Sequence, residues 1–146
     1  MKRQALQPSL TPSAATVRAW IVASTLIIVG VIHLLPAVGM VGGARLTALY
    51  GMPFDDIDLA VLMRHRAVLF ALLGALLVIA AFRPSLQAAA FVAGFVSVVS
   101  FLLLAWLEGP VNGVLARVVR VDIAALACLV VGAWAAYGPG SSDAAA

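Results

Sequence analysis

The chain has 146 residues, of which 64% are hydrophobic and only 10% are charged, with a formal net charge of +3. Soluble proteins average about 25% charged residues, so this composition excludes an ordinary soluble domain and predicts an integral membrane protein. The basic residues are scattered singly between apolar runs, which excludes the basic stripe of a nucleic-acid-binding protein.

The amino-terminal residues 1–16 are predicted to form a polar tail. The first apolar run begins at Val17 and extends beyond the length of a signal-peptide core, so we expect a retained membrane helix over about residues 17–35. Ser13 or Thr16 is suited to cap this helix. A long connection follows, residues 36–56, rich in glycine. Within it we expect a short helix near residues 44–50 and carboxylates that cap the next helix, from Asp55, Asp56 and Asp58.

Three further apolar segments, at about residues 57–82, 86–107 and 115–137, also approach or exceed the roughly 20 residues needed to cross a bilayer. Short connections at residues 83–85 and 108–113 make consecutive helices antiparallel neighbours. The predicted fold is therefore all-α: a four-transmembrane-helix antiparallel bundle, residues 17–137, with a longer Gly-rich first connection. Residues 138–146 are predicted to be a disordered tail. Counting Lys and Arg on the two faces gives no firm membrane orientation.

Polar residues gather where one end of each predicted helix meets the same membrane face. Helical phase, at about 100° per residue, places Arg64 on the small-residue face of its helix and Arg66 on the lipid side, with His65 between them. The same reasoning turns Glu108, Arg117 and Arg120 inward. The predicted ligand-binding residues are the four inward ones, Arg64, Arg117, Arg120 and Glu108, together with Asp122 and His33, which reach the same face.

Three inward arginines face at most two acids, so one positive charge is left for an external anion. Arginine suits phosphate or carboxylate groups, and the sequence thus predicts binding of an anionic amphiphile: a phospholipid, an isoprenoid phosphate or a quinone-like molecule. One alternative is a membrane enzyme that performs acid/base chemistry on a lipid, with His33, His65 and Glu108 as candidate catalytic residues. The other is a structural or accessory subunit whose charges only pair. Membrane lipid is the expected partner, and a homo-oligomer or a partner membrane subunit is left open.

The histidines and the cysteine give little support for a cofactor. His33 alone near a helix end is typical of a hydrogen-bonding residue. Together with His65 it would supply two haem or metal ligands, but no cysteine, methionine or carboxylate cluster completes such a set. Cys128 lies alone in an apolar run, which excludes a disulfide, a CxxC pair and a cysteine-based metal site. No cofactor and no metal are expected.

The stretches PAVGMVGGARLTALYG and RHRAVLF, together with the chain length and four predicted spans, give the chain a family resemblance. It resembles the small bacterial four-helix integral membrane proteins described in the broad sense as DoxX-like. The resemblance implies a multi-pass bundle in the bacterial inner membrane. Some members of that group are associated with redox or sulfur metabolism, but no paired cysteine is present here to carry such a role.

Overall fold

The computed structural model describes residues 13–139, and this part of the chain is helical with no strand. The amino-terminal and carboxy-terminal tails predicted above lie almost entirely outside the described residues. In chain order the elements are α1 (Ala14–Leu34), the 3-10 helix η1 (Leu35–Val41), α2 (Gly43–Tyr50), α3 (Ile57–Ala80), α4 (Pro84–Glu108) and α5 (Gly113–Tyr137). The predicted all-helical class and the short helix in the first connection are confirmed, whereas η1 was not predicted.

Side-chain caps fix where the helices begin. The Ser13 hydroxyl accepts from the Thr16 N–H at 3.2 Å, and the Asp56 carboxylate accepts from the Leu59 N–H at 2.8 Å. Each satisfies a backbone donor that the first helical turn leaves without a partner. Both caps were predicted from sequence. Asn112 does the same for α5, where its Oδ1 accepts from two backbone N–H groups.

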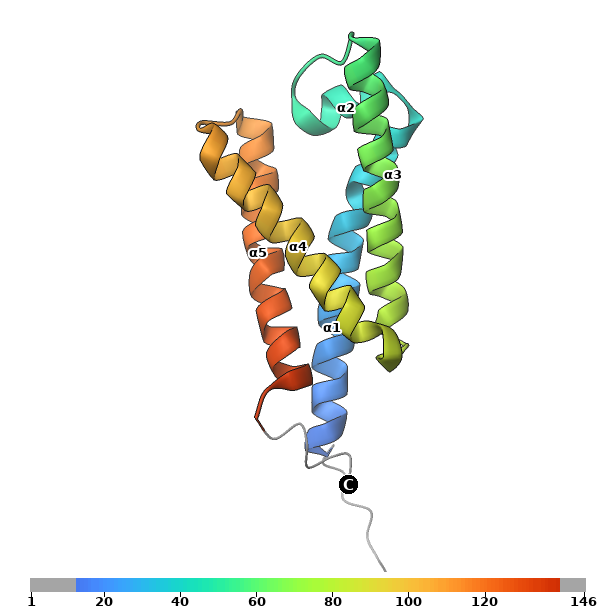
Figure 1. Cartoon of the computed structure of the whole chain (residues 1–146), viewed down its shortest axis with the longest axis vertical. Coiled ribbons are helices and arrows are strands. Elements are labelled where there is room, and N and C mark those ends of the chain that lie inside the picture. The colour runs from blue at the N-terminus through green and yellow to red at the C-terminus, as the bar shows by residue number, and fades with distance from the viewer. Residues whose placement is uncertain (1–12, 140–146) are drawn as a thin grey trace, which may run out of the picture.

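The long helix α1 packs against both α3 and α5, and α4 packs against the same two helices. Successive long helices run in opposite directions (Figure 1). At the end of the molecule where α2 lies, the α4–α5 pair diverges from the α1–α3 pair (Figure 1). The helices therefore pack tightly at one end and leave more room between them at the other.

Small residues make the two central helix crossings close. A Cβ atom added at Gly74 of α3 would lie 2.8 Å from the backbone oxygen of Gly30 in α1, and one added at Gly132 of α5 would lie 2.6 Å from the Cγ2 atom of Thr25. Such close backbone approach is how helices gain packing energy in a membrane, where lipid removes the hydrophobic drive for association. Large apolar side chains fill the core beside these crossings, the fully buried ones including Leu26, Leu77, Val98 and Leu129.

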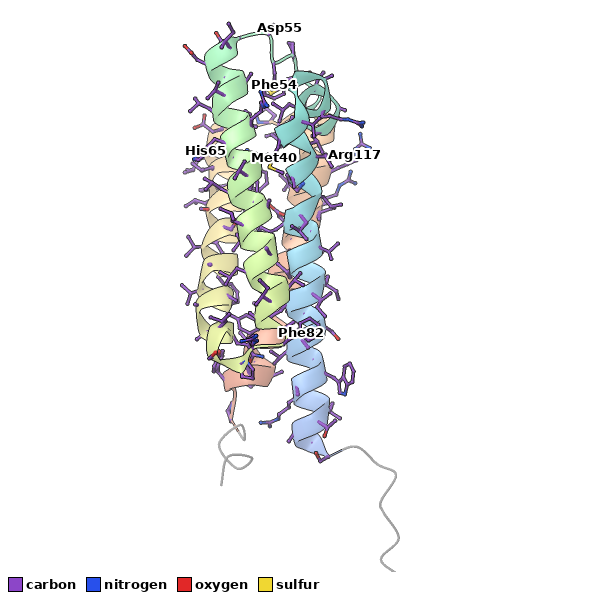
Figure 2. The ribbon with its side chains drawn as sticks, turned by 90° about the vertical axis from the view of Figure 1, so that its right-hand side faces the viewer. Met40, Phe54, Asp55, His65, Phe82 and Arg117 are labelled. Carbon is purple, nitrogen blue, oxygen red and sulfur yellow. The ribbon has the colours of Figure 1, made fainter. Side chains whose placement is uncertain are left out.

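The outer surface of the described chain is largely apolar. Three segments are long and apolar enough to cross a membrane: Ala14–Val41, Ile57–Ala80 and Pro84–Glu108. Exposed aromatic side chains lie toward both ends of the bundle: Trp20, Phe82 (Figure 2) and Trp134 at the end where α1 begins and α5 ends, and Trp106 near the end of α4. Aromatic residues of this kind are enriched at membrane interfaces. The predicted fourth helix is present as α5, and its crossing of a membrane stays a prediction.

Candidate functional site

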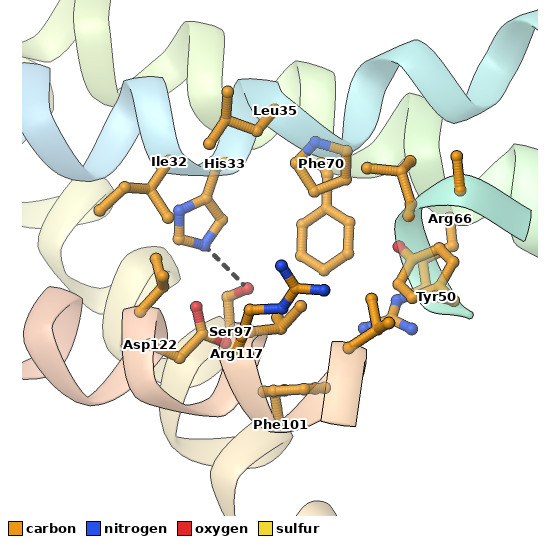
Figure 3. Close-up of a pocket in the computed structure, with 16 residues that line it drawn as sticks. Ile32, His33, Leu35, Tyr50, Arg66, Phe70, Ser97, Phe101, Arg117 and Asp122 are labelled. Atoms are coloured by element: carbon orange, nitrogen blue, oxygen red, sulfur yellow. Dashed lines mark hydrogen bonds between the residues drawn. The ribbon is translucent and has the colours of Figure 1, made fainter. Parts of the chain in front are cut away.

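A cavity of about 330 Å³ lies in the half of the molecule where the helix pairs diverge, and it is partly open to the outside. Its volume falls within the range of pockets that hold small molecules. All six helical elements contribute to it (Figure 3). Its lining is mainly apolar, with a few polar groups: Ile32, His33, Leu35, Pro36, Ala48, Leu49, Tyr50, Arg66, Phe70, Ser97, Phe101, Val114, Arg117, Val118, Val121 and Asp122.

The polar residues at the deep end of the cavity, its floor, lie well inside the bundle and away from the helix ends. Asp122 follows the first residue of α5 by nine residues, about 13 Å along the helix axis. Ser97 precedes the last residue of α4 by eleven residues, about 16 Å. On the first chain segment, η1 extends beyond His33 toward the same end. A ligand that reaches this floor therefore lies between the helices rather than on their tips.

His33 is 4% exposed and is held by two hydrogen bonds. Its Nδ1 lies 2.9 Å from the backbone oxygen of Val29, and its Nε2 lies 3.2 Å from the Ser97 hydroxyl (Figure 3). Because a carbonyl oxygen only accepts, Nδ1 carries the proton of that bond. Phe70 packs edge-on to the imidazole at a centroid separation of 5.8 Å. The predicted role of His33 as a hydrogen-bonding residue is confirmed, and the same side chain also faces the cavity.

Arg66 lies among aromatic rings. Its guanidinium carbon is 4.9 Å from the ring centre of Phe70, 5.7 Å from that of Phe101 and 5.8 Å from that of Tyr50. Cation–π attraction to the ring faces therefore holds the guanidinium inside the bundle without a carboxylate partner. Burial raises the pKa of the Tyr50 phenol while Arg66 opposes that rise, so the phenol stays protonated and keeps a proton to donate.

The connection that covers the cavity is tied to α5. The Asn112 amide donates to the Tyr50 backbone oxygen at 2.9 Å while its own oxygen caps α5. Gly51 follows with φ 67°, a left-handed conformation that glycine adopts without strain. A Cβ at this position would also lie 2.8 Å from Val114 Cγ2. The end of α2 is thus positioned against the start of α5 by backbone geometry and one bridging amide.

The cavity lining carries more positively charged than negatively charged side chains. The lining carries two guanidinium groups, from Arg66 and Arg117, and one carboxylate, from Asp122 (Figure 3). Within residues 13–139, the arginine side chains that form hydrogen bonds donate to backbone oxygens, Arg18 to Pro139 and Arg64 to Met40. The lining therefore has a net positive charge when His33 is neutral.

The structure reverses the predicted directions of Arg64 and Arg66. Arg64 is exposed, and its Nε–H donates to the Met40 backbone oxygen at 2.9 Å, so it caps the end of η1. Arg66 is the one that lines the cavity. The small-residue face of α3 that includes Gly74 packs against α1 too closely to leave space. The adjoining face, which includes Phe70 and the fully buried Leu77, was predicted to meet lipid but instead turns toward α4 and the cavity.

The predicted inward positions on α5 also change. The buried face of α5 runs through Ala125, Leu129 and Gly132, and Asp122 continues that face into the cavity. Arg120 is exposed because it lies about 200° around the helix from Val118, which lines the cavity. Arg120 was predicted to turn inward and instead points away from the cavity, whereas Asp122 lines it.

The remaining predicted residues lie apart from the cavity. Glu108 is the last residue of α4 and is exposed, and His65 is exposed on α3 (Figure 2). Of the six predicted ligand-binding residues, the structure brings together His33, Arg117 and Asp122. The two histidines do not share the cavity, and the described residues contain no group of three potential metal ligands from His, Cys, Asp or Glu.

Sequence reasoning missed four lining residues that shape the chemistry of the cavity: Tyr50, Phe70, Ser97 and Phe101. Nothing in the local sequence separates these aromatic residues from others in apolar runs. Comparison with protein-family models, with curated proteins and with solved structures finds no match. The function has to be inferred from the site itself.

Proposed function

We propose that this protein is a multi-pass protein of the bacterial inner membrane whose four long helices form an antiparallel transmembrane bundle, and that it binds an anionic amphiphile in the cavity. The three membrane-capable segments and the exposed apolar surface support the membrane assignment. The proposed DoxX-like relationship would be consistent with this architecture. The proposed membrane bundle and its ligand do not depend on the DoxX-like relationship, and that relationship does not depend on them.

The observation that carries the ligand proposal is the composition of the cavity. Two guanidinium groups and one carboxylate lie within an otherwise apolar lining. An unpaired charge inside a membrane bundle is costly and commonly marks a binding or transport site. An anionic headgroup would offset the excess positive charge, and its alkyl portion would lie along Leu35, Val118 and Val121.

The chemistry of the ligand follows from the donors. Arg66 and Arg117 present planar, permanently charged groups that suit phosphate or carboxylate oxygens. The Tyr50 phenol offers a neutral donor at the same site. A phospholipid, an isoprenoid phosphate and a quinone-like molecule all combine oxygen acceptors with an alkyl chain. The first two classes make fuller use of both arginines.

Native mass spectrometry of the purified chain tests this proposal. We expect wild-type protein to retain an anionic amphiphile, and Arg66→Ala and Arg117→Ala each to weaken retention by more than about tenfold, because each removes a charge-assisted hydrogen bond. Added phosphatidylglycerol, an isoprenyl phosphate and a ubiquinone then distinguish the ligand classes. Phosphatidylcholine serves as the zwitterionic control.

Matched controls come from arginines of the same helices that do not line the cavity. Arg64→Ala on α3 and Arg120→Ala on α5 remove the same charge outside the cavity, so they should leave retention near the wild-type value. Equal losses in all four variants would indicate general electrostatic attraction to lipid and would contradict a specific site. Wild-type protein that retains none of the offered amphiphiles would also contradict it.

The alternative of a structural subunit whose charges only pair is less well supported. That hypothesis requires arginine–carboxylate contacts between helices, whereas the arginine hydrogen bonds within the described chain go to backbone oxygens. The enzyme alternative, as first framed, relied on a histidine acting with Glu108. The cavity instead places His33 beside Ser97, a pairing with different chemistry.

A further inference from the structure

The Ser97 hydroxyl has a hydrogen-bond partner that is unusual for a serine inside a helix. Helical serines commonly bond to a carbonyl of the preceding turn, and Ser100 does so here, donating to the Ser97 backbone oxygen at 3.1 Å. Ser97 instead lies 3.2 Å from Nε2 of His33 on a different helix. Both residues line the cavity.

The direction of this hydrogen bond follows from the other nitrogen of the imidazole. Nδ1 donates its proton to the Val29 carbonyl at 2.9 Å, and in the neutral ring this leaves Nε2 with a lone pair. Ser97 must then be the donor. The Ser97 hydroxyl proton therefore points at the imidazole of His33, which can act as a base. The Val29 carbonyl holds that imidazole in the required tautomer.

We infer that Ser97 is a nucleophile activated by His33, and that the cavity cleaves or transfers an acyl ester of the amphiphile it binds. A nucleophile within hydrogen-bond reach of a base, with that base oriented by a third group, is the arrangement that activates serine in acyl transfer. The Val29 carbonyl serves as the orienting group. This inference rests on the proposed function, because the cavity must first admit an ester-bearing amphiphile.

The reaction balances with water as the only co-reactant. Ser97 Oγ attacks the ester carbonyl carbon, and its proton passes to His33 Nε2. The tetrahedral intermediate expels the alcohol, which takes that proton and leaves an acyl-serine. Water, deprotonated by His33, then attacks the acyl carbon and releases the carboxylic acid and the free serine.

The surrounding charges suit this chemistry. The negative oxygen of the tetrahedral intermediate needs donors fixed in advance, and Arg66 and Arg117 supply positive charge to the same cavity (Figure 3). The aromatic rings around Arg66 hold its guanidinium in place. The mainly apolar lining limits water, which strengthens these interactions.

A long-chain alkyl fluorophosphonate tests the inference directly, since Ser97 would displace fluoride and form a stable phosphonate ester. With the full-length chain in detergent micelles, we expect one adduct by intact-mass measurement, mapped to Ser97 by peptide analysis. Ser97→Ala should abolish it. His33→Gln keeps a hydrogen-bonding side chain but lacks the base, so we expect labelling at least about 100-fold slower.

Ser100→Ala is the matched control, because Ser100 lies one turn away on the same helix, is exposed and bonds only to its own helix. It should label at the wild-type rate. No adduct on wild-type protein, an adduct on Ser97→Ala, or an unchanged rate in His33→Gln would each overturn the inference. A single gel-filtration peak from each variant establishes that lost labelling does not reflect unfolding.

The same samples separate this inference from the binding proposal. Retention of the amphiphile by the wild-type protein is measured by native mass spectrometry beside its reaction with the fluorophosphonate. Wild-type protein that retains the amphiphile but resists the fluorophosphonate would overturn the acyl-transfer inference and leave the binding proposal in place. Labelling at Ser97 without retention of any offered amphiphile would contradict the binding proposal.

Discussion

Arg66 shows how aromatic residues can hold a charged group inside an apolar bundle. Three rings lie within 6 Å of its guanidinium carbon, at 4.9, 5.7 and 5.8 Å. Cation–π contacts are worth more when water is excluded, to roughly 2 kcal/mol. They also leave the N–H donors of the guanidinium available to another group. A carboxylate partner would have occupied those donors.

Asp122 would lower the affinity of the proposed site for an anion. It lines the cavity together with Arg66 and Arg117, and its carboxylate would repel a negative headgroup. We therefore expect Asp122→Asn to increase retention of phosphatidylglycerol by about tenfold, equivalent to about 1.4 kcal/mol. Titration of the lipid, followed by native mass spectrometry, measures the change. Weaker retention would instead indicate that Asp122 positions the arginines.

At the scale of elements, the close helix crossings control the shape of the cavity. α1 contacts α3 at Gly30 and Gly74 and contacts α5 at Thr25 and Gly132, so these crossings hold α1 close to both helices. The α4–α5 pair then diverges toward the other end (Figure 1). The space between the helices is thus a consequence of where small residues permit close approach and where they are missing.

Gly74→Ala tests this control of helix separation. In an ordinary helix, replacing glycine with alanine favours folding by up to about 1 kcal/mol. Here the new Cβ would lie 2.8 Å from the Gly30 backbone oxygen, so we expect a net loss of about 1–3 kcal/mol. Thermal unfolding of the detergent-solubilised chain should show a lower Tm.

Gly113→Ala is the control for this substitution, because an added Cβ at the start of α5 meets no atom within 4 Å. It should leave the Tm unchanged or raise it slightly. A similar Tm change in both variants would show that helix propensity, rather than the contact with α1, governs the effect.

At the scale of the whole molecule, the question is whether α5 crosses the membrane with the other helices. Three segments have the length and apolarity to do so, while α5 carries Arg117, Arg120 and Asp122 in its first half. In the proposed bundle, α5 tolerates these groups because Asp122 and Arg117 face the cavity. Arg120 would extend its charged end toward the membrane interface.

Cysteine labelling of spheroplasts tests this topology. Cys128 is the single cysteine of the chain, so Cys128→Ser gives a background without thiols. With four spans, Ser13→Cys and Pro139→Cys should react with an impermeant maleimide from the same side of the membrane. Asp55→Cys and Val111→Cys should react from the opposite side. If Pro139→Cys and Val111→Cys react from one side, α5 does not cross.

Local sequence determined the elements of this protein. Apolar runs and caps such as Ser13 and Asp56 predicted the helices closely, because helix formation depends on neighbouring residues and their hydrogen bonds. The sequence also identified His33, Arg117 and Asp122 as residues of interest at one end of the bundle. The resemblance to DoxX-like proteins remains a prediction.

Tertiary structure alone decided which side chains meet. Helical phase gives the angle of Arg64 and Arg66 around α3, but it does not say which neighbouring helix lies on each side or how closely it packs. The Gly30–Gly74 crossing excluded space on one face, and the divergence of α4 opened it on the other. The packing of α4 beside α1 also brought Ser97 to His33, a contact between residues 64 positions apart in sequence. Such contacts depend on the packing of several helices together, which no local pattern encodes.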